Sequence, residues 1–191
     1  GVMSDGQVVT YDATPASNDR ETGTLGSVLQ SPSKVPTSFL IDPDDAPSWG
    51  YLKGAKKEQR KAPSGFTYNY SEGPVTFPDA LDRPSRTIVT GEGGAGASRF
   101  KHVVQFRPTK SQREELGLDG DAANRARELI GIPKSEWIRR LTPLELERLN
   151  GFPDNHTEGV GDSKRAFFMG NALVCGVVER IGESIIRNQN K

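Results

Sequence analysis

The stretch that decides the organisation of the chain is Arg139-Arg140-Leu141-Thr142-Pro143-Leu144-Glu145-Leu146-Glu147-Arg148-Leu149-Asn150-Gly151-Phe152-Pro153. Thr142 can cap a helix with its hydroxyl, Pro143 suits the first helical position, and Glu145 completes a capping box. Asn150-Gly151 ends the helix because glycine readily adopts the left-handed conformation. The pattern therefore predicts a short helix. Leu146 and Leu149 share its buried face, whereas Glu145, Glu147 and Arg148 stay in solvent.

Charge is distributed unevenly along the chain, although the 191 residues carry a formal net charge of zero. Residues 1–50 hold 2 basic and 7 acidic side chains, whereas residues 51–113 hold 12 basic and 5 acidic ones. Residues 114–191 return to a slight acidic excess, with 11 basic and 13 acidic side chains. A basic central block attracts polyanions such as DNA, but a plain solvated surface would have the same charge.

Composition excludes several classes of protein. The single cysteine, Cys175, rules out a disulfide framework and fits a reducing cytoplasm. No apolar run approaches the roughly 20 residues that cross a bilayer, so we expect no membrane partner. The two histidines, His102 and His156, have no cysteine pair or carboxylate cluster at ligand spacing, so we expect no metal site.

The middle of the chain has the pattern of a small β-rich unit. Phe66–Tyr70, Arg86–Thr90 and Phe100–Phe106 are rich in β-formers and read as strands, and Gly91–Ser98 reads as a mobile loop. Other segments have weaker signals, and we list them with the structure that each predicts: residues 1–24 an extended or unordered lead-in, Leu25–Leu29 a helical turn, Val35–Ile41 a strand or docking segment, and Tyr51–Lys61 an exposed helix or loop.

The second half of the chain is predicted to be helical. Thr109–Leu116 has a capping pair in Thr109 and Gln112, and Ala122–Ile130 stops at Gly131. After a polar loop at Asp154–Lys164, residues 172–187 form the longest predicted helix. Its apolar side chains recur at four-residue steps and define one buried face: Leu173, Val177, Ile181 and Ile185.

Two ordered motifs in this half resemble one family. The run Arg139–Pro153 resembles the ninth conserved motif of the DNA cytosine-5 methyltransferases, and Gly170-Asn171-Ala172, eighteen residues past Phe152, resembles the tenth. Residues 25–107 are also similar, less specifically, to a target-recognition region of one subfamily. The resemblance implies S-adenosyl-L-methionine as cofactor, double-stranded DNA as partner, and a place in a bacterial restriction-modification system in the cytoplasm.

The chemistry that this family needs is missing from the sequence. The family's nucleophile is the cysteine of a Pro-Cys pair, but Cys175 follows Val174 inside an apolar stretch and reads as a small core residue. The family's Glu-Asn-Val motif and its glycine-rich cofactor turn are also absent. The resemblance therefore covers only the C-terminal part of the family's plan, and we expect no catalytic residue here.

The resemblance assigns roles to particular residues. Asn171 and Ala172 would line the cofactor pocket, and a recognition segment at 86–102 would enter the major groove, where each side chain could meet a base or a phosphate. The candidates for DNA contact are Arg86, Thr87, Ser98, Arg99, Lys101 and His102. The candidates for a structural role in the ninth motif are Arg140, Thr142, Glu145, Gly151 and Pro153. The cations that we expect to meet phosphate or solvent are Lys53, Lys56, Lys57, Arg60 and Lys61.

These observations predict an α+β fold with three parts. Residues 1–24 are the lead-in, residues 25–136 a small twisted β-rich target-recognition domain, and residues 137–191 helices that complete an absent Rossmann-like catalytic domain. The chain would be a subunit or C-terminal fragment of a DNA cytosine-5 methyltransferase, inactive without its catalytic half. Two alternatives stay open: a degenerate DNA-binding regulator without methyltransferase activity, and a structural protein that binds no DNA.

Overall fold

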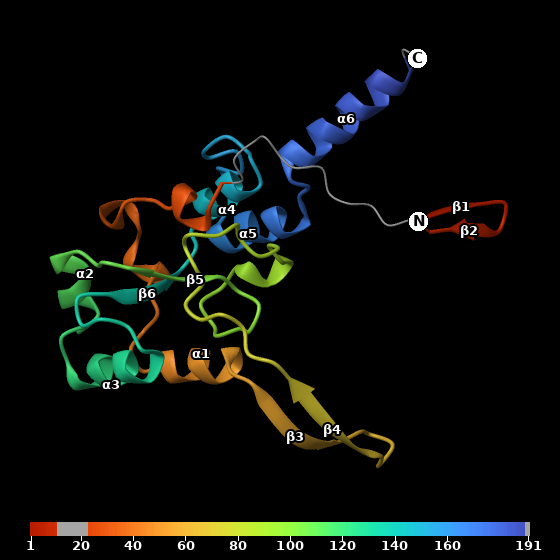
Figure 1. Cartoon of the computed structure of the whole chain (residues 1–191). Helices are drawn as coiled ribbons and strands as arrows, with labels where there is room; N and C mark the ends of the chain where they lie inside the picture. Colours follow the sequence, from red (N-terminus) through yellow and green to blue (C-terminus); the bar gives the residue numbers. More distant parts are fainter. Residues whose placement is uncertain (11–22, 190–191) are drawn as a thin grey trace.

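The computed structural model describes residues 1–10 and 23–189 and shows a mixed α+β fold of short elements (Figure 1). Its strands are β1 (Val2–Ser4), β2 (Gln7–Val9), β3 (Lys56–Lys61), β4 (Thr67–Glu72), β5 (Val103–Phe106) and β6 (Trp137–Arg140). Its α-helices are α1 (Ala46–Lys53), α2 (Lys110–Glu115), α3 (Asp121–Ile130), α4 (Pro143–Leu149), α5 (Asp162–Asn171) and α6 (Cys175–Gln189). Short 3₁₀ turns are η1 (Leu25–Val28), η2 (Pro32–Lys34), η3 (Thr37–Phe39) and η4 (Thr90–Glu92).

The antiparallel pair β5–β6 lies at the centre of the packed region. Its register places Val103 opposite Arg140 and Phe106 opposite Trp137. Successive side chains of a strand point to opposite faces, and accordingly Val103 and Val104 pack into two different apolar clusters. This pair therefore separates two layers of helices.

The first layer contains α1 and α3, which contact each other and lie end to end on one face of β5–β6 (Figure 1). Trp49 from α1 and Trp137 from β6 are almost fully buried there, and the Trp137 indole N–H donates to the Ile41 carbonyl at 2.7 Å. Burying a large apolar side chain contributes about 1.5–3 kcal/mol, so these two tryptophans are major contributors to the core. The second layer, α4 and α5, covers the opposite face through Leu146 and Met169.

Several predicted elements are confirmed. The helical turn at Leu25–Leu29 is η1, and the strands predicted at Phe66–Tyr70 and Phe100–Phe106 are β4 and β5. Helices α2 and α3 match their predicted positions, and α2 has the expected capping box. Gly131 ends α3 with a φ of +78°, which is a conformation that glycine adopts without strain.

Two predictions in the first half of the chain were wrong, and a third was right only in part. Residues 86–89 form extended coil rather than a strand, and Thr90 then opens η4. Tyr51–Lys61 is not one exposed helix or loop, because α1 runs to Lys53 and Lys56–Lys61 is strand β3. Strand β3 lacks apolar alternation because its ribbon with β4 is exposed on both faces, so the usual strand signal is absent. Val35–Ile41 contains a 3₁₀ turn, with Leu40 bridged to Arg139.

The lead-in also differs from expectation. Strands β1 and β2 form a hairpin whose turn residues, Asp5 and Gly6, have φ values of +50° and +76°. An Asp-Gly pair between two short strands is a strong hairpin signal, although here each strand has only three residues. Residues 11–22 of the predicted lead-in lie outside the described residues.

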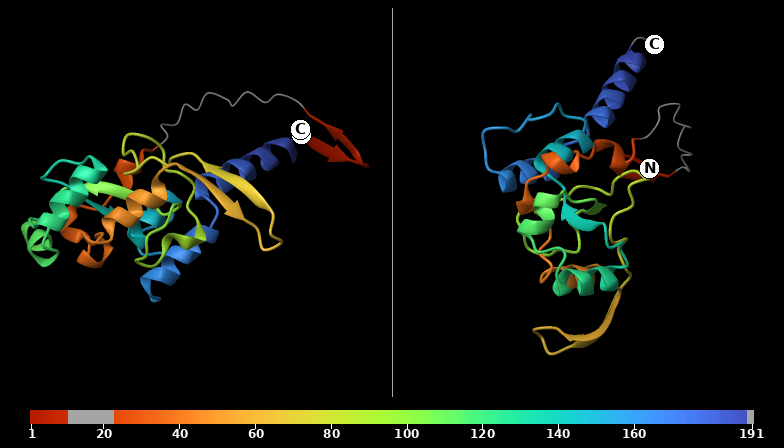
Figure 2. Two further views of the ribbon diagram at one scale, coloured as in Figure 1. Left: turned by 90° about the horizontal axis from the view of Figure 1, so that it is seen from below. Right: turned by 90° about the vertical axis from the view of Figure 1, so that its left-hand side faces the viewer.

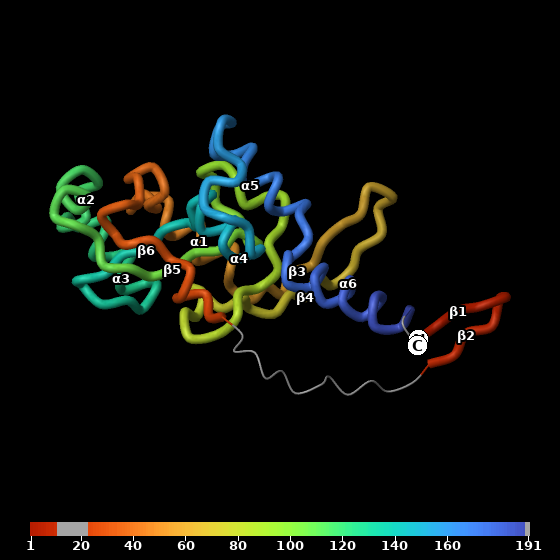
Figure 3. The backbone as a smooth tube through the Cα atoms, turned by 90° about the horizontal axis from the view of Figure 1, so that it is seen from above, coloured from red at the N-terminus to blue at the C-terminus, as the bar shows by residue number. Residues whose placement is uncertain are grey.

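The C-terminal region forms two helices rather than one. Helix α5 occupies part of the predicted polar loop and the Gly170-Asn171 motif, and α6 starts at Cys175. Helix α6 extends away from the packed layers (Figures 1 and 3), and Ile181 at its middle is 56% exposed. The face predicted to be buried therefore has no apolar partner among the described residues. None of the helices in residues 1–10 and 23–189 combines the length and apolarity needed to span a membrane.

Candidate DNA interface

The α4 motif forms the scaffold beside which the candidate site lies. Thr142 and Glu145 form the predicted capping box: the Glu145 carboxylate accepts from the Thr142 N–H at 2.8 Å, and the Thr142 hydroxyl accepts from the Glu145 N–H at 3.3 Å. Arg139 donates to both carboxylate oxygens of Glu145, at 2.8 and 2.7 Å. Both side chains are fully buried, so this bidentate pair fixes the end of β6 to the start of α4.

The prediction that Glu145 and Glu147 are solvated was wrong, because both have no exposed surface. Helix α4 packs against both α5 and η1, and each of its carboxylates has a cationic partner. Burial raises the pKa of Glu147, but hydrogen bonds from Arg165 and Thr157 outweigh it and lower that pKa overall. Arg148 alone of the three lies near solvent, paired with Asp154.

Arg140 connects the motif to the glycine-rich loop. Its guanidinium donates to the carbonyls of Gly94 at 2.9 Å and Ser38 at 2.6 Å. Burial lowers the pKa of Arg140 below its ordinary value. Gly151 ends α4 with a φ of +78°, and Pro153 follows it at the exit. Arg140 therefore helps to hold a loop that the sequence alone suggested was mobile.

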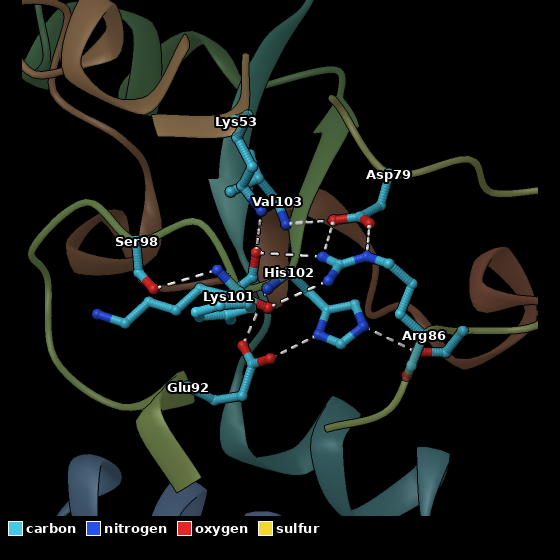
Figure 4. Close-up of polar contacts among 10 residues, drawn as sticks. Lys53, Asp79, Arg86, Glu92, Ser98, Lys101, His102 and Val103 are labelled. Carbon is cyan, nitrogen blue, oxygen red and sulfur yellow. Dashed lines mark hydrogen bonds and ion pairs between the residues drawn. The ribbon is translucent and has the colours of Figure 1, made fainter. Parts of the chain in front are cut away.

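The guanidinium of Arg86 is held by other groups of the protein (Figure 4), although the side chain is 34% exposed. Its Nε lies 2.6 Å from one oxygen of Asp79, and its Nη2 lies 3.1 Å from the other. The same guanidinium donates to the carbonyl of Phe100 at 3.2 Å. Asp79 in turn accepts from the Val103 N–H at 2.8 Å, so Arg86 connects the coil at 86–89 to the beginning of β5.

His102 has no exposed surface and lies beside Glu92 (Figure 4), and Ser85 contacts the other nitrogen of its ring. Its Nδ1 is 2.6 Å from Glu92 Oε1, and its Nε2 is 3.0 Å from Ser85 Oγ. The order of groups is that of a catalytic triad, but the imidazole is sealed from solvent and the Ser85 hydroxyl donates to the Arg86 carbonyl at 2.8 Å. The three residues therefore cross-link the segment rather than present a nucleophile.

The ammonium of Lys101 makes two hydrogen bonds within the chain. Its ammonium donates to the carbonyls of Gly94 at 3.0 Å and Gly96 at 2.8 Å. Burial, with a smaller contribution from the charge of Arg140, lowers the pKa of Lys101. These bonds keep the glycine-rich loop in place.

Arg99 holds the base of the ribbon β3–β4. Its Nε pairs with Glu72 at 2.6 Å, and one of its Nη atoms donates to the carbonyls of Leu52 at 3.0 Å and Gly54 at 3.2 Å. Its other Nη donates to the carbonyl of Gly73. The guanidinium thus joins the residues just before β3 to those at the end of β4.

The remaining two candidates lie nearer solvent. Thr87 is exposed, and Ser98 is half-buried with its hydroxyl accepting from the Phe100 N–H at 3.2 Å. Of the six residues proposed for DNA contact, four therefore have their polar groups occupied inside the protein. Sequence reasoning selected them by residue type, and type does not reveal which cations have protein partners.

The ribbon β3–β4 is the surface that sequence reasoning undervalued. It projects from the packed layers in every view (Figures 1 and 2), and nearly all of its side chains are exposed. Lys57 and Lys61 lie on it with no ion pair to another described residue. The signal that could have found it is a pair of short polar segments, one rich in lysine and one in tyrosine, on either side of a Pro-Ser-Gly turn.

Ala172, one of the two cofactor candidates, borders a pocket. A pocket of about 390 Å³ is lined by Ala172, Arg86, Thr87 and Asn150, among others. Asn171 does not line this pocket; it is exposed at the end of α5, and its amide donates to the Phe167 carbonyl at 2.9 Å. The fold thus brings Ala172 close to Arg86 and Thr87 but leaves Asn171 facing outward.

Cys175 begins α6 rather than lying within an apolar core. It is half-buried, and its N–H donates to the Asn150 carbonyl at 2.8 Å. A Cβ at Gly151 would lie 3.3 Å from the Cys175 Cβ, so the two residues are in close contact. No group of three or more potential metal ligands occurs in residues 1–10 and 23–189.

Comparison with known proteins shows which family the chain resembles. The family model for C-5 cytosine-specific DNA methylase matches residues 22–187. The type II methyltransferase M.Sau3AI of Staphylococcus aureus is 35% identical over 185 residues, which is 97% of this chain and 37% of that protein. The type II methyltransferase M.HpaII of Haemophilus parainfluenzae is 26% identical over 165 residues, which is 83% of this chain and 37% of that protein. No solved structure matches the chain significantly.

The chain thus spans a little over a third of the length of the curated relatives that it matches. The family match extends from η1 through most of α6, so it includes the ribbon, the buried ion pairs and the α4 motif. The chain belongs to the C-5 cytosine-specific DNA methylase family.

Proposed function

We propose that this chain is the DNA-recognition and cofactor-site-completing part of a DNA cytosine-5 methyltransferase. The observation that carries the proposal is the family match over residues 22–187 on a chain that corresponds to 37% of each relative. The reaction served is methyl transfer from S-adenosyl-L-methionine to C5 of cytosine in duplex DNA, as in a bacterial restriction-modification system. The place of action would be the bacterial cytoplasm, on DNA.

The bond-making residues would come from another polypeptide segment. A nucleophile must attack C6 of a base that has been rotated out of the duplex. Cys175 does not suit this role, because it follows Val174 and its backbone is fixed to Asn150 at the start of α6. This chain would instead select the DNA site and close the reaction centre against water.

The residues present fit one wall of a cofactor site. Ala172, Asn150 and Thr87 offer a small apolar surface and polar groups along the pocket described above. The lining has no carboxylate, which is the usual acceptor for the ribose hydroxyls of a nucleoside. The catalytic part would supply that acceptor, and Asn171, which faces outward and lies outside this pocket, would meet the cofactor only where the catalytic part docks.

Helix α6 is the surface by which the chain would bind the catalytic part. Contiguous apolar patches exposed on the surface of a soluble protein mark interaction sites. Its exposed apolar side chains, together with the two that precede the helix, are Leu173, Val174, Val177, Val178, Ile181, Ile185 and Ile186. Docking of this face would also bring Ala172 and Asn171 to the partner, because they immediately precede it in the chain.

Complementation tests the proposal. The chain is co-expressed with a polypeptide that carries the family's cofactor-binding and Pro-Cys motifs, and transfer of a tritiated methyl group to cytosine is measured. We expect transfer only when both are present, and we expect Ile181→Asp to reduce it at least tenfold. DNA binding without transfer in any pairing would contradict the proposal and favour the regulator without methyltransferase activity.

A further inference from the structure

The two faces of the ribbon β3–β4 differ in how their polar groups are used. The antiparallel register pairs Glu58 with Tyr70 and Arg60 with Tyr68, so these four side chains share one face. On that face Arg60 pairs with Glu58 and lies 3.6 Å from the centre of the Tyr70 ring. At the base of the ribbon, the Lys56 ammonium lies 3.8 Å from the Glu72 carboxylate on the same face. The charged side chains of this face are therefore paired with one another.

The opposite face holds only polar side chains that have no such partners. The register places Lys57 opposite Ser71, Gln59 opposite Asn69, and Lys61 opposite Thr67. All six residues are exposed, and none has a side-chain hydrogen bond or ion pair with another described residue. We call this set, Lys57, Gln59, Lys61, Thr67, Asn69 and Ser71, the open face.

Charge distinguishes the two faces as well. The open face carries two lysines and no acidic residue, whereas the opposite face balances Lys56 and Arg60 with Glu58 and Glu72. A polyanion is therefore attracted to the open face in preference to the other. The charge distribution alone would orient the ribbon on a duplex.

We propose that the open face lies in the DNA major groove and reads base edges, with Gln59 and Asn69 as the reading pair. This inference rests on the proposed function and names the specificity-determining surface within it. The amides of Gln and Asn can bond N6 and N7 of adenine in bidentate fashion, and Ser and Thr hydroxyls can bond several bases. Lys57 and Lys61 flank the pair and would bond guanine or the adjacent phosphates.

The dimensions of the ribbon fit the groove. Two paired strands lie about 4.8 Å apart, and a major groove about 12 Å wide admits a two-stranded ribbon. Strands β3 and β4 have six residues each, so the ribbon is about 20 Å long. Because the ribbon projects from the helical layers (Figure 2), it can enter a groove without a clash with the core.

The base of the ribbon is fixed firmly enough to position the open face. An isolated hairpin is marginally stable in water, so a reading surface built on one needs support. Arg99 supplies it through four bonds at the base, and the Val75 N–H donates to the Lys53 carbonyl at 2.8 Å. Arg99 is thus a positioning residue for DNA recognition, which replaces its predicted role as a direct contact.

Selection from a random duplex library tests this proposal. The full chain and the Gln59→Ala/Asn69→Ala variant are each used to enrich bound duplexes, and the enriched sequences are compared. The matched control is Tyr68→Phe/Tyr70→Phe, which removes two hydroxyls from the opposite face. We expect the wild type and the control to enrich the same short site, and the reading-pair variant to lose preference at one or two base pairs by roughly tenfold or more.

A second variant keeps the test decisive if the double variant perturbs the hairpin. Gln59→Glu preserves the side-chain shape but replaces the amide donor with an acceptor, so it should change the preferred base at one position. An unchanged site in both variants would overturn the ribbon proposal and leave the proposed function standing. If the wild type enriches no site at all, the proposed function fails and the ribbon proposal fails with it.

Discussion

The molecule contains two antiparallel strand pairs that use charge in opposite ways. In β5–β6 at the centre, Arg139 and Arg140 are buried and donate to Glu145, Gly94 and Ser38. In the ribbon β3–β4, by contrast, Lys57 and Lys61 are exposed and have no described partner. Both regions look basic in sequence, yet only the ribbon has cations free to meet another molecule.

A cation that already has partners within the protein is a poor candidate for DNA contact. A cation whose donors are filled by backbone carbonyls or buried carboxylates would lose those bonds on turning toward DNA, and an unmade buried bond costs about 1–3 kcal/mol. Arg86, Arg99 and Lys101 are of this kind.

Breaking the central ion pair should have the largest effect. Glu145→Ala leaves Arg139 charged and buried without its partner, and it also removes the acceptor of the Thr142 and Gln30 N–H groups. We expect the free energy of unfolding to fall by about 3–5 kcal/mol. Chemical denaturation measures it. The control is Glu183→Ala in the exposed pair with Arg187, which should change stability by less than about 0.5 kcal/mol.

Removing the support of the ribbon should have a large but local effect. Arg99→Ala deletes the bonds that join Glu72, Gly54 and Gly73 at the base. Amide hydrogen exchange of β3–β4 should accelerate by roughly tenfold or more, while exchange in β5–β6 stays as in the wild type. Equal acceleration in both pairs would show that the ribbon is not a separate unit. Arg125→Ala on exposed α3 surface serves as the control.

Removing the open-face cations should weaken DNA binding without changing the fold. The slope of log affinity against log salt is negative, and each lost phosphate contact reduces its magnitude by about 0.9. Lys57→Gln/Lys61→Gln should therefore make that slope less steep by about 1–2 in fluorescence anisotropy with labelled duplex. A slope equal to that of the wild type would place the phosphate contacts elsewhere. Lys110→Gln, on α2, provides the comparison at an exposed lysine.

The buried lysine at the end of α1 should give a smaller, pH-dependent effect. Burial lowers the pKa of Lys53 from 10.5 to about 8, against the opposing attraction of Asp79. Between about pH 8 and 10.5 the unfolded chain binds more protons than the folded one, so the free energy of unfolding should rise with pH across this window. Lys53→Met removes that contribution. Urea denaturation at several pH values should show that the free energy of unfolding rises less steeply with pH in Lys53→Met than in the control, Lys110→Met.

The sequence predicted elements whose signals are local and missed those set by tertiary partners. The Thr142 cap, the Thr109 cap and the end of α3 at Gly131 follow from side chains a few residues apart, and each was confirmed. Burial of Glu145 and Glu147 depends on Arg139 and Arg165, whose placement requires the fold. No local sequence pattern predicts such ion pairs.

The candidate site was predictable in region but not in detail. The basic block at 51–113 contains the ribbon, but residue type pointed to Arg86–His102 rather than to Lys57–Ser71. Residue type alone does not show that Asp79 and Glu92 already occupy the polar groups of Arg86 and His102 in the folded chain. The family resemblance carried more of the functional assignment than composition or periodicity did.

Lysine acetylation with and without duplex DNA tests the central claim most directly, because it reports which cations meet DNA. At saturating DNA we expect Lys57 and Lys61 to react at least several-fold more slowly, while Lys110, whose side chain is 90% exposed on α2, keeps its rate. Equal rates at Lys57 and Lys61 with and without bound DNA would contradict the assignment of the open face as the DNA-reading surface.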